Sequence, residues 1–544
     1  MTNKPRVPGD YTQLLTSDQQ RLHRMLKKGA TRRDMMRWML AGGLAASTSS
    51  LIIGSATRAY ADTPKSGGKM TFAFDQHSPA DTLDPILFTN TIDYFRGRMY
   101  YGSLVRLTNN LGYEPELAEE IIPNEDATVW TFKLRKGVEF HNGKTLTADD
   151  VVYSMNRHLG ENSLSNAAAL VTMVDSWEKV NEHEVRANLS SPYSDLPIVL
   201  GTFHFKIVPD GTEDFATAVG TGPYRAAEFK PGVRSVGTKF ENFWDEGGYL
   251  DEIETYAISD PVSRVNAFLS GDVDAAMNLP PNNIETVNAT EGRDVWEVES
   301  GAFINIEAQM EMLPAEGGQD LLLAMKHLQD RKRIVKGVLQ GHGSMGNDQP
   351  IGPTYFDHCP DIPQRELDLD KAKYHFQKSG LGDTAIELVA APVAPGAVEQ
   401  CTFMQREAAK IGMNMNVRNV STDGYYSSIW AQVPFFVVRW NMRPSANMML
   451  SLAWQSGVSW NGTKWGNEQF DQLLESSRAA TDPAVRKQMY CDLQTMLHND
   501  GGNMIPAHLN LTDGIASDVK GRTFNPLTNF GGAECPQYLW RESA

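Results

Sequence analysis

The sequence predicts an α/β protein with more than one lobe, and three observations lead to this fold class. The chain has 544 residues, which exceeds the usual size of one compact domain. Its content of 41% hydrophobic and 9% aromatic residues is that of a chain with a buried core. Strand-like and helix-like patterns of apolar residues alternate along the chain, without a low-complexity linker or an internal repeat. Lobes that lack a linker indicate several chain crossings between them.

The first 61 residues differ in charge from the rest of the chain. They contain ten basic and three acidic residues, a net charge of +7, whereas the other residues carry 40 basic and 64 acidic side chains, a net charge of −24. Arg32 and Arg33 precede a weakly apolar stretch, and Ala59-Tyr60-Ala61 matches a cleavage site. We expect residues 1–61 to be a twin-arginine signal peptide, read by the twin-arginine translocase, and the mature chain to be periplasmic. The apolar run is shorter than the ~20 residues of a membrane anchor.

Composition excludes several classes of function. The acidic balance is a poor match to nucleic acid, because affinity for nucleic acid comes mainly from neutralised phosphates. The four cysteines show no C-x-x-C spacing and the twelve histidines no H-E-x-x-H motif, so we expect no metal site, no cofactor and no catalytic site. Cys401 and Cys491, both in predicted helices, are one candidate disulfide pair, and the sequence leaves the connectivity of Cys359 and Cys535 open.

The predicted elements follow one another in this order. Residues 68–74 alternate as an opening strand, and 91–101 have helical spacing. Residues 129–135 alternate too, so that Trp130, Phe132 and Leu134 share one strand face. Thr147 and Asp150 form a capping box at the start of a helix. Further strands are expected at 233–240, 253–258, 413–420 and 434–440, and helices at 261–269, 320–339, 369–378, 396–410 and from Pro483 to about 501.

Several ordered motifs resemble one known family. They are Pro115–Glu119, Trp130–Gly143, Thr147–Val151, Gly220–Tyr224, Phe268–Asp274, Asp330–Leu339, Pro350–Pro353 and Leu369–Ala372. Together they resemble the family 5 solute-binding proteins of ABC importers, which include periplasmic dipeptide-, oligopeptide- and nickel-binding proteins. The resemblance covers residues 66–540.

The resemblance implies a two-lobe periplasmic-binding-protein fold, type II and cluster C-like, with an inserted subdomain and a hinged cleft. Lobe I would comprise residues 62–105, 220–308 and 504–544. The inserted subdomain would span 106–219, and lobe II would span 309–503. Chain crossings near 303–309 and 503–507 would form the hinge, and the ligand would bind between the lobes.

One position departs from the peptide-binding members of this family. In these proteins a lobe II strand ends in Trp, two residues and an Asp that pairs with the peptide ammonium group. Here Trp440 is followed by Asn441, Met442 and Arg443. A guanidinium repels an ammonium group and binds carboxylate, sulfonate or phosphate, so we expect an anionic ligand. If the alignment slips, Arg443 is a surface residue instead.

Nearby aromatic and amide residues complete the expected site. Its candidate ligand-binding residues are Arg443, Trp440, Asn441, Trp460, Asn461, Tyr425 and, on the hinge strand, Asn305, which is equally well explained by a structural hydrogen bond. Because side chains alternate along a strand, we expect Trp440 rather than Arg439 to face the cleft.

The expected function is that of a periplasmic substrate-binding protein, a monomer, that delivers a small anionic ligand to an inner-membrane ABC permease. The ligand classes considered are an acidic or modified peptide, an opine-like amino-acid conjugate and a metal–polycarboxylate chelate. One alternative is an ordinary dipeptide or oligopeptide receptor in which another acid, such as Asp423, pairs with the ammonium group. A periplasmic enzyme or a holdase-type chaperone is the alternative from another class, and no motif supports it.

Overall fold

The fold is known from a computed structural model, which describes residues 63–75, 81–421, 425–480 and 482–543 and a few positions before residue 40. Most of the expected signal peptide, including Arg32, Arg33 and its cleavage site, lies outside the described residues. Among the helices that the structure describes, none combines the length and apolarity needed to cross a bilayer.

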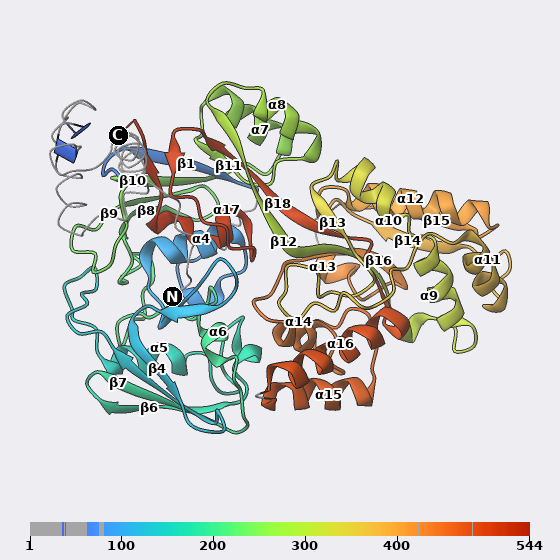
Figure 1. Ribbon diagram of the computed structural model, residues 1–544, viewed down its shortest axis with the longest axis horizontal. Helices are drawn as coiled ribbons and strands as arrows, with labels where there is room; N and C mark the ends of the chain where they lie inside the picture. Colours follow the sequence, from blue (N-terminus) through green and yellow to red (C-terminus); the bar gives the residue numbers. More distant parts are fainter. Residues whose placement is uncertain are drawn as a thin grey trace.

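One sheet of twelve strands runs through both lobes (Figure 1). Its main path has the order β15-β14-β16-β12-β18-β11-β1-β10-β9-β8, with β13 and β17 paired beside it. The strands are β1 (Lys69–Phe74), β8 (Tyr224–Lys230), β9 (Arg234–Lys239), β10 (Glu252–Ala257), β11 (Ala275–Ala276), β12 (Arg293–Ala308), β13 (Gly343–Met345), β14 (Ile386–Ala390), β15 (Met415–Asn419), β16 (Phe435–Trp440), β17 (Asn503–Met504) and β18 (Ala507–Ala516).

Strand β12 joins the lobes because it is long enough to pair with strands of both. Its first part is antiparallel to β18, from Arg293 to Phe303. Its last part, from Phe303 to Ala308, is antiparallel to β16. The expected crossing near 303–309 is therefore a hydrogen-bonded strand, whereas the expected domain boundaries stay a prediction.

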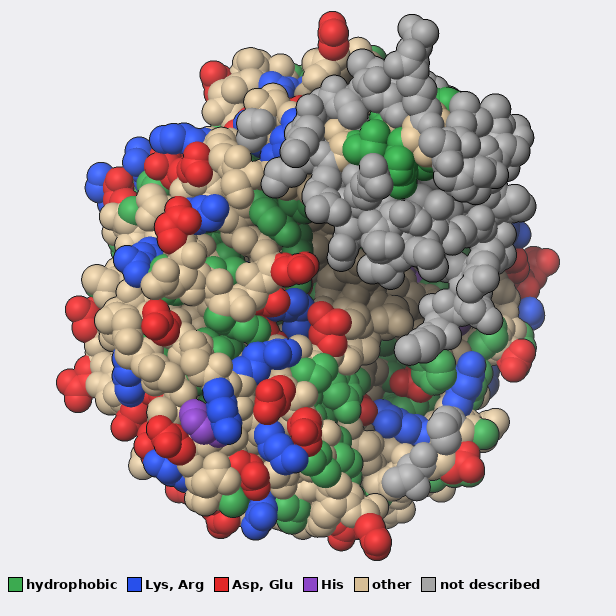
Figure 2. All heavy atoms as spheres, turned by 60° about the vertical axis from the view of Figure 1, so that its left-hand side comes forward, with side chains coloured by type: hydrophobic (Ala, Val, Ile, Leu, Met, Phe, Trp, Pro, Cys, Tyr) green, Lys and Arg blue, Asp and Glu red, His purple; other side chains and the backbone are tan. Residues whose placement is uncertain are grey.

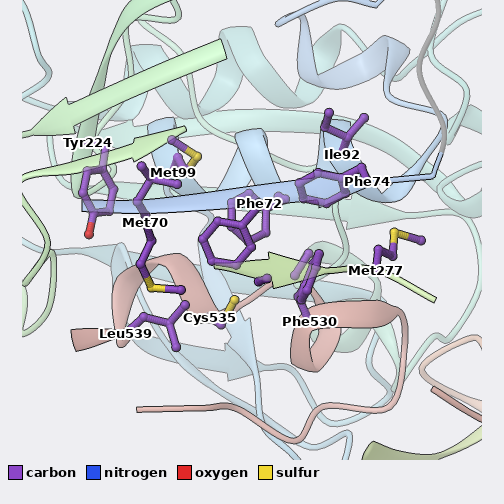
Figure 3. Close-up of a cluster of buried hydrophobic side chains, with 14 of the residues drawn as sticks. Met70, Phe72, Phe74, Ile92, Met99, Tyr224, Met277, Phe530, Cys535 and Leu539 are labelled. Atoms are coloured by element: carbon purple, nitrogen blue, oxygen red, sulfur yellow. The ribbon is translucent and has the colours of Figure 1, made fainter. Parts of the chain in front are cut away.

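The core of the first lobe brings together segments that are far apart in the sequence (Figure 3). Phe72 and Phe74 of β1 pack against Phe530 of α17 (Asn529–Gly532), with ring centroids 5.2 Å apart in both pairs. Phe95 of α4 (Thr91–Tyr100) closes the cluster. Burial of these rings holds the C-terminal segment against the opening strand. The helices α7 (Pro261–Ser270) and α8 (Ile284–Asn288) lie beside β11 and β12.

A second sheet is formed by residues that fall between the first-lobe segments in the sequence. It has the order β4-β5-β7-β6, formed by Ala118–Pro123, Val129–Leu134, Glu184–Leu189 and Val174–Asn181, with α5 (Ala148–Asn156) and α6 (Leu196–Leu200) beside it. Trp130, Phe132 and Leu134 are buried together, which confirms the predicted strand face. The capping box between Thr147 and Asp150 is also confirmed. Two small sheets complete the strands: β2 (Val105–Leu107) with β3 (Tyr113–Pro115), and β19 (Val519–Lys520) with β20 (Trp540–Arg541).

Helices cover the strands of the second lobe. They are α9 (Gly318–His327), α10 (Arg331–Arg333), α11 (Leu369–Lys378), α12 (Ala397–Lys410), α13 (Tyr425–Ser428), α14 (Ala446–Ala453), α15 (Glu468–Ala479) and α16 (Pro483–Asp500). The single helix predicted over 320–339 is wrong, because α9 ends at His327. Asp330 then caps the N-terminus of a separate short helix, α10, by accepting a hydrogen bond from the amide of Arg333 at 3.0 Å. A π-helical turn follows over Ile334–Val338.

A disulfide joins Cys359 to Cys491, so the candidate pair of Cys401 with Cys491 is wrong. The thiol of Cys401 is buried in the lobe core, because α12 packs against β14 and β15. The partner of Cys491 comes instead from the loop that precedes α11. Cys535 is also a buried thiol.

The visible surface carries acidic and basic side chains that are interspersed (Figure 2). Exposed ion pairs of the described residues include Lys133–Glu120 and Lys179–Asp149. Exposed pairs of this kind contribute little to stability. They suit solubility and say nothing about the ligand.

Candidate ligand-binding site

A cavity of about 490 Å³ lies between the lobes. Its lining comes from five separate segments of the chain: residues 88–94 of the first lobe, 166–170 and 202–204 beside the second sheet, 430–460 of the second lobe, and 527–528 near the C-terminus. This volume fits a small organic ligand.

Arg443 borders this cavity just after the end of β16. Its Nη1 atom donates to two carbonyl oxygens of its own loop, that of Asn441 at 3.0 Å and that of Met442 at 3.3 Å. Its backbone amide donates to the hydroxyl of Tyr355 at 3.0 Å. Burial lowers the pKa of Arg443. Among the residues that the structure describes, no carboxylate forms an ion pair with this guanidinium, so an anion entering the cavity would find it unpaired.

The charge of Arg443 acts on groups of the opposite lobe. Burial raises the pKa of Tyr94 to about 12, and Arg443 opposes that rise. Burial lowers the pKa of His204 to about 4, and Arg443 adds to that fall. His204 is therefore neutral at neutral pH, and Arg443 provides the positive charge at this place.

Aromatic rings form much of the cavity wall. Tyr94 and Phe203 stack with centroids 4.0 Å apart and planes only 11° from parallel. On the other lobe, the ring centroids of Trp440 and Trp460 are 6.2 Å apart. The guanidinium carbon of Arg443 lies 5.9 Å from the Trp460 ring centroid. The cavity thus offers flat apolar surfaces beside a cation.

Trp440 is fixed from behind by a buried carboxyl. Its Nε1 atom donates to Oε1 of Glu307 on β12 at 2.9 Å, and Nδ2 of Asn305 donates to the same oxygen at 3.0 Å. Oδ1 of Asn305 accepts from the amide of Met504 at 2.9 Å, which ties β12 to β17. These bonds hold one wall of the cavity on the strand that joins the lobes.

The structure brings four of the seven predicted site residues to the cavity: Arg443, Trp440, Asn441 and Trp460. The other three are buried elsewhere. Tyr425 donates to the carbonyl of Val437 at 2.7 Å, Asn461 donates to that of Trp465 at 2.8 Å, and Asn305 lies behind Trp440. Arg439 borders the cavity as well, although strand alternation predicted only one of Arg439 and Trp440 there.

Sequence reasoning missed the opposite wall. Tyr94 was part of a predicted helix, and nothing near Phe203 or His204 in the sequence marks a site. Their position follows from packing of the lobes. No described lining residue is Asp or Glu, and Asp423 lies outside the described residues. The described part of the chain also holds no group of three or more His, Cys, Asp or Glu that could bind a metal ion.

Known proteins share this architecture. The dipeptide-binding protein of Escherichia coli is 24% identical over 84% of this chain and 92% of its own length. Heme-binding protein A of Haemophilus influenzae is 24% identical over 87% of this chain and 93% of its own. Among solved structures, AgaA of Agrobacterium tumefaciens R10 in complex with agropinic acid matches with a TM-score of 0.76 and 22% identity, covering 87% of this chain and 99% of that one.

These matches show a two-lobe fold of the type II periplasmic binding proteins. The family model described as bacterial extracellular solute-binding proteins, family 5 middle, matches residues 112–462, which is more than half of the chain. The chain therefore belongs to family 5 of the bacterial extracellular solute-binding proteins.

Proposed function

We propose that this chain is the periplasmic substrate-binding protein of an ABC importer and that it captures a small anionic ligand between its lobes. The ligand would be an acidic or modified peptide, an opine-like conjugate or a metal–polycarboxylate chelate, handed on to an inner-membrane permease. Export by the twin-arginine translocase and a monomeric state belong to this proposal. Family membership and the cavity between the lobes support the role of a binding protein.

The observation that carries the choice of an anion is the unpaired guanidinium of Arg443. A cation in a partly desolvated cavity binds a carboxylate or phosphate with short, charge-assisted hydrogen bonds. The same cation opposes the ammonium group of an ordinary peptide, and no described lining residue offers a carboxylate to hold that group. The cavity therefore favours a ligand that brings the negative charge itself.

Binding measurements on the Arg443→Met variant test the proposal. Methionine keeps an apolar stem of similar length and removes the charge. Loss of one partner of a buried charge pair costs about 2 kcal/mol or more, so we expect at least a ~30-fold loss of affinity for the anion identified by mass spectrometry of the copurified material. Arg418→Met is the matched control, because Arg418 is exposed on β15 and pairs with Glu387.

An ordinary peptide receptor would give the opposite result. Tight binding of neutral dipeptides that Arg443→Met leaves unchanged would overturn the proposal and would favour an ammonium-binding acid elsewhere, such as Asp423.

A further inference from the structure

We infer that the anion bound in this cavity carries a planar aromatic ring and has no ammonium group. The inference rests on the proposed function and adds the chemical class of the ligand. It comes from three features of the described lining: the rings on both walls, the use already made of its polar side chains, and the lack of a carboxylate.

Aromatic rings face the cavity from both lobes. Tyr94 and Phe203 stack face to face with centroids 4.0 Å apart, so each ring covers one face of the other and the pair presents only its outer faces. Trp440 and Trp460 belong to the opposite lobe, and Trp460 is 42% exposed, which is high for so large an apolar side chain. A planar ring between the two walls would cover aromatic surface on both of its faces.

Four polar side chains of the described lining are already hydrogen-bonded to the protein. The bonds are Asn166 Nδ2 to the Leu87 carbonyl at 3.0 Å, Thr202 Oγ1 to the Val199 carbonyl at 2.7 Å, His204 Nε2 with the Phe88 carbonyl at 2.8 Å, and the Thr528 hydroxyl with that of Thr91 at 2.7 Å. A sugar-like ligand would bury hydroxyl groups against these engaged atoms and leave some of them without a partner. An aromatic body needs no such partners.

Donors remain on several described lining residues, among them Arg439, Asn441, Arg443 and Tyr94. The guanidinium of Arg443 and the hydroxyl of Tyr94, which makes no hydrogen bond within the described part of the chain, suit one acidic group at the edge of the ring. No described lining residue could accept hydrogen bonds as a carboxylate, so an ammonium group on the ligand would be buried without a counter-charge.

A matched series of probes tests the inference by titration calorimetry on the purified protein. The probes are 2-naphthoate, its saturated analogue decalin-2-carboxylate, glucuronate, uncharged 2-naphthylmethanol and the ammonium-bearing 3-(2-naphthyl)alanine. We expect 2-naphthoate to bind at least tenfold more tightly than each of the others. Phe203→Leu and Trp460→Leu should each weaken 2-naphthoate at least fivefold and leave decalin-2-carboxylate within twofold. Tyr374→Leu, at an exposed ring on α11, is the control and should change neither.

The outcomes separate this inference from the proposed function. Equal or tighter binding of glucuronate or decalin-2-carboxylate, still dependent on Arg443, would overturn the aromatic ligand and leave the anionic ligand standing. Tightest binding of the ammonium-bearing probe, unaffected by Arg443→Met, would overturn both. Lack of measurable 2-naphthoate binding at 1 mM would overturn the inference as well.

Discussion

The indole of Trp440 donates a hydrogen bond to Oε1 of Glu307 at 2.9 Å, so a wall of the cavity rests on a buried carboxyl. Burial raises the pKa of Glu307 to about 7, and the bonds from Trp440 and Asn305 only partly oppose that rise. Oε2 of Glu307 has no hydrogen-bond partner in the part of the chain described. This carboxyl therefore changes protonation near neutral pH.

The Glu307→Gln variant should lose a pH dependence of stability. A carboxyl whose pKa is higher in the folded than in the unfolded state binds its proton more tightly when folded, so folding is favoured as pH falls through about 7 towards the unfolded value near 4.5. We expect the wild type to lose up to about 3 kcal/mol relative to the variant between pH 4.5 and 8. Urea titrations of both proteins across this range measure the difference. Parallel stability curves would show that Glu307 does not titrate there.

Tyr355→Phe should weaken binding of the anion although it removes no charged group. The buried hydroxyl of Tyr355 accepts the hydrogen bond of the Arg443 amide, and the variant leaves that amide unpaired. We expect a loss of about 1–2 kcal/mol in the free energy of unfolding and a several-fold weaker affinity. Chemical denaturation and calorimetry measure the two effects. Tyr374→Phe, at an exposed ring, should change neither.

Reduction of the Cys359–Cys491 disulfide should destabilise the protein. The bond closes a loop with a sequence separation of 132 residues. Loop-closure entropy predicts a loss of about 5 kcal/mol. Thermal unfolding of wild type and of the Cys359→Ser/Cys491→Ser double variant measures it. Without reductant, Cys401 and Cys535 should react with a thiol reagent only after unfolding, and reaction of either in the native protein would contradict their burial.

Asp513→Ala should be among the most destabilising single changes in the first lobe. Oδ1 of Asp513 accepts from the amide of Asn278 at 3.0 Å and from Nδ2 of Asn529 at 2.7 Å, and Oδ2 accepts from the amide of Phe530 at 2.6 Å. Removing the carboxyl leaves these buried donors unpaired, which should cost about 3 kcal/mol or more. Equilibrium unfolding measures it. The exposed Asp383→Ala should stay within about 0.5 kcal/mol of wild type.

Local signals predicted most of the elements. The strand with Trp130 and Phe132 and the helix capped by Thr147 were predicted because alternation and capping depend on adjacent residues. The helix over 320–339 was predicted too long, since its spacing continues through the break at Asp330. A cap within an apolar pattern is easily overlooked, because the pattern itself does not change.

The sequence by itself determined the α/β class, the family and the presence of a cation, Arg443, shortly after Trp440, because these are contained in contiguous motifs. Only the tertiary structure decided which residues face that cation. Tyr94, Phe203 and Arg443 meet at one cavity although they lie far apart along the chain, and Cys359 rather than Cys401 reaches Cys491. Such contacts depend on how lobes and helices pack in three dimensions, and packing between distant segments leaves no periodic trace in the sequence.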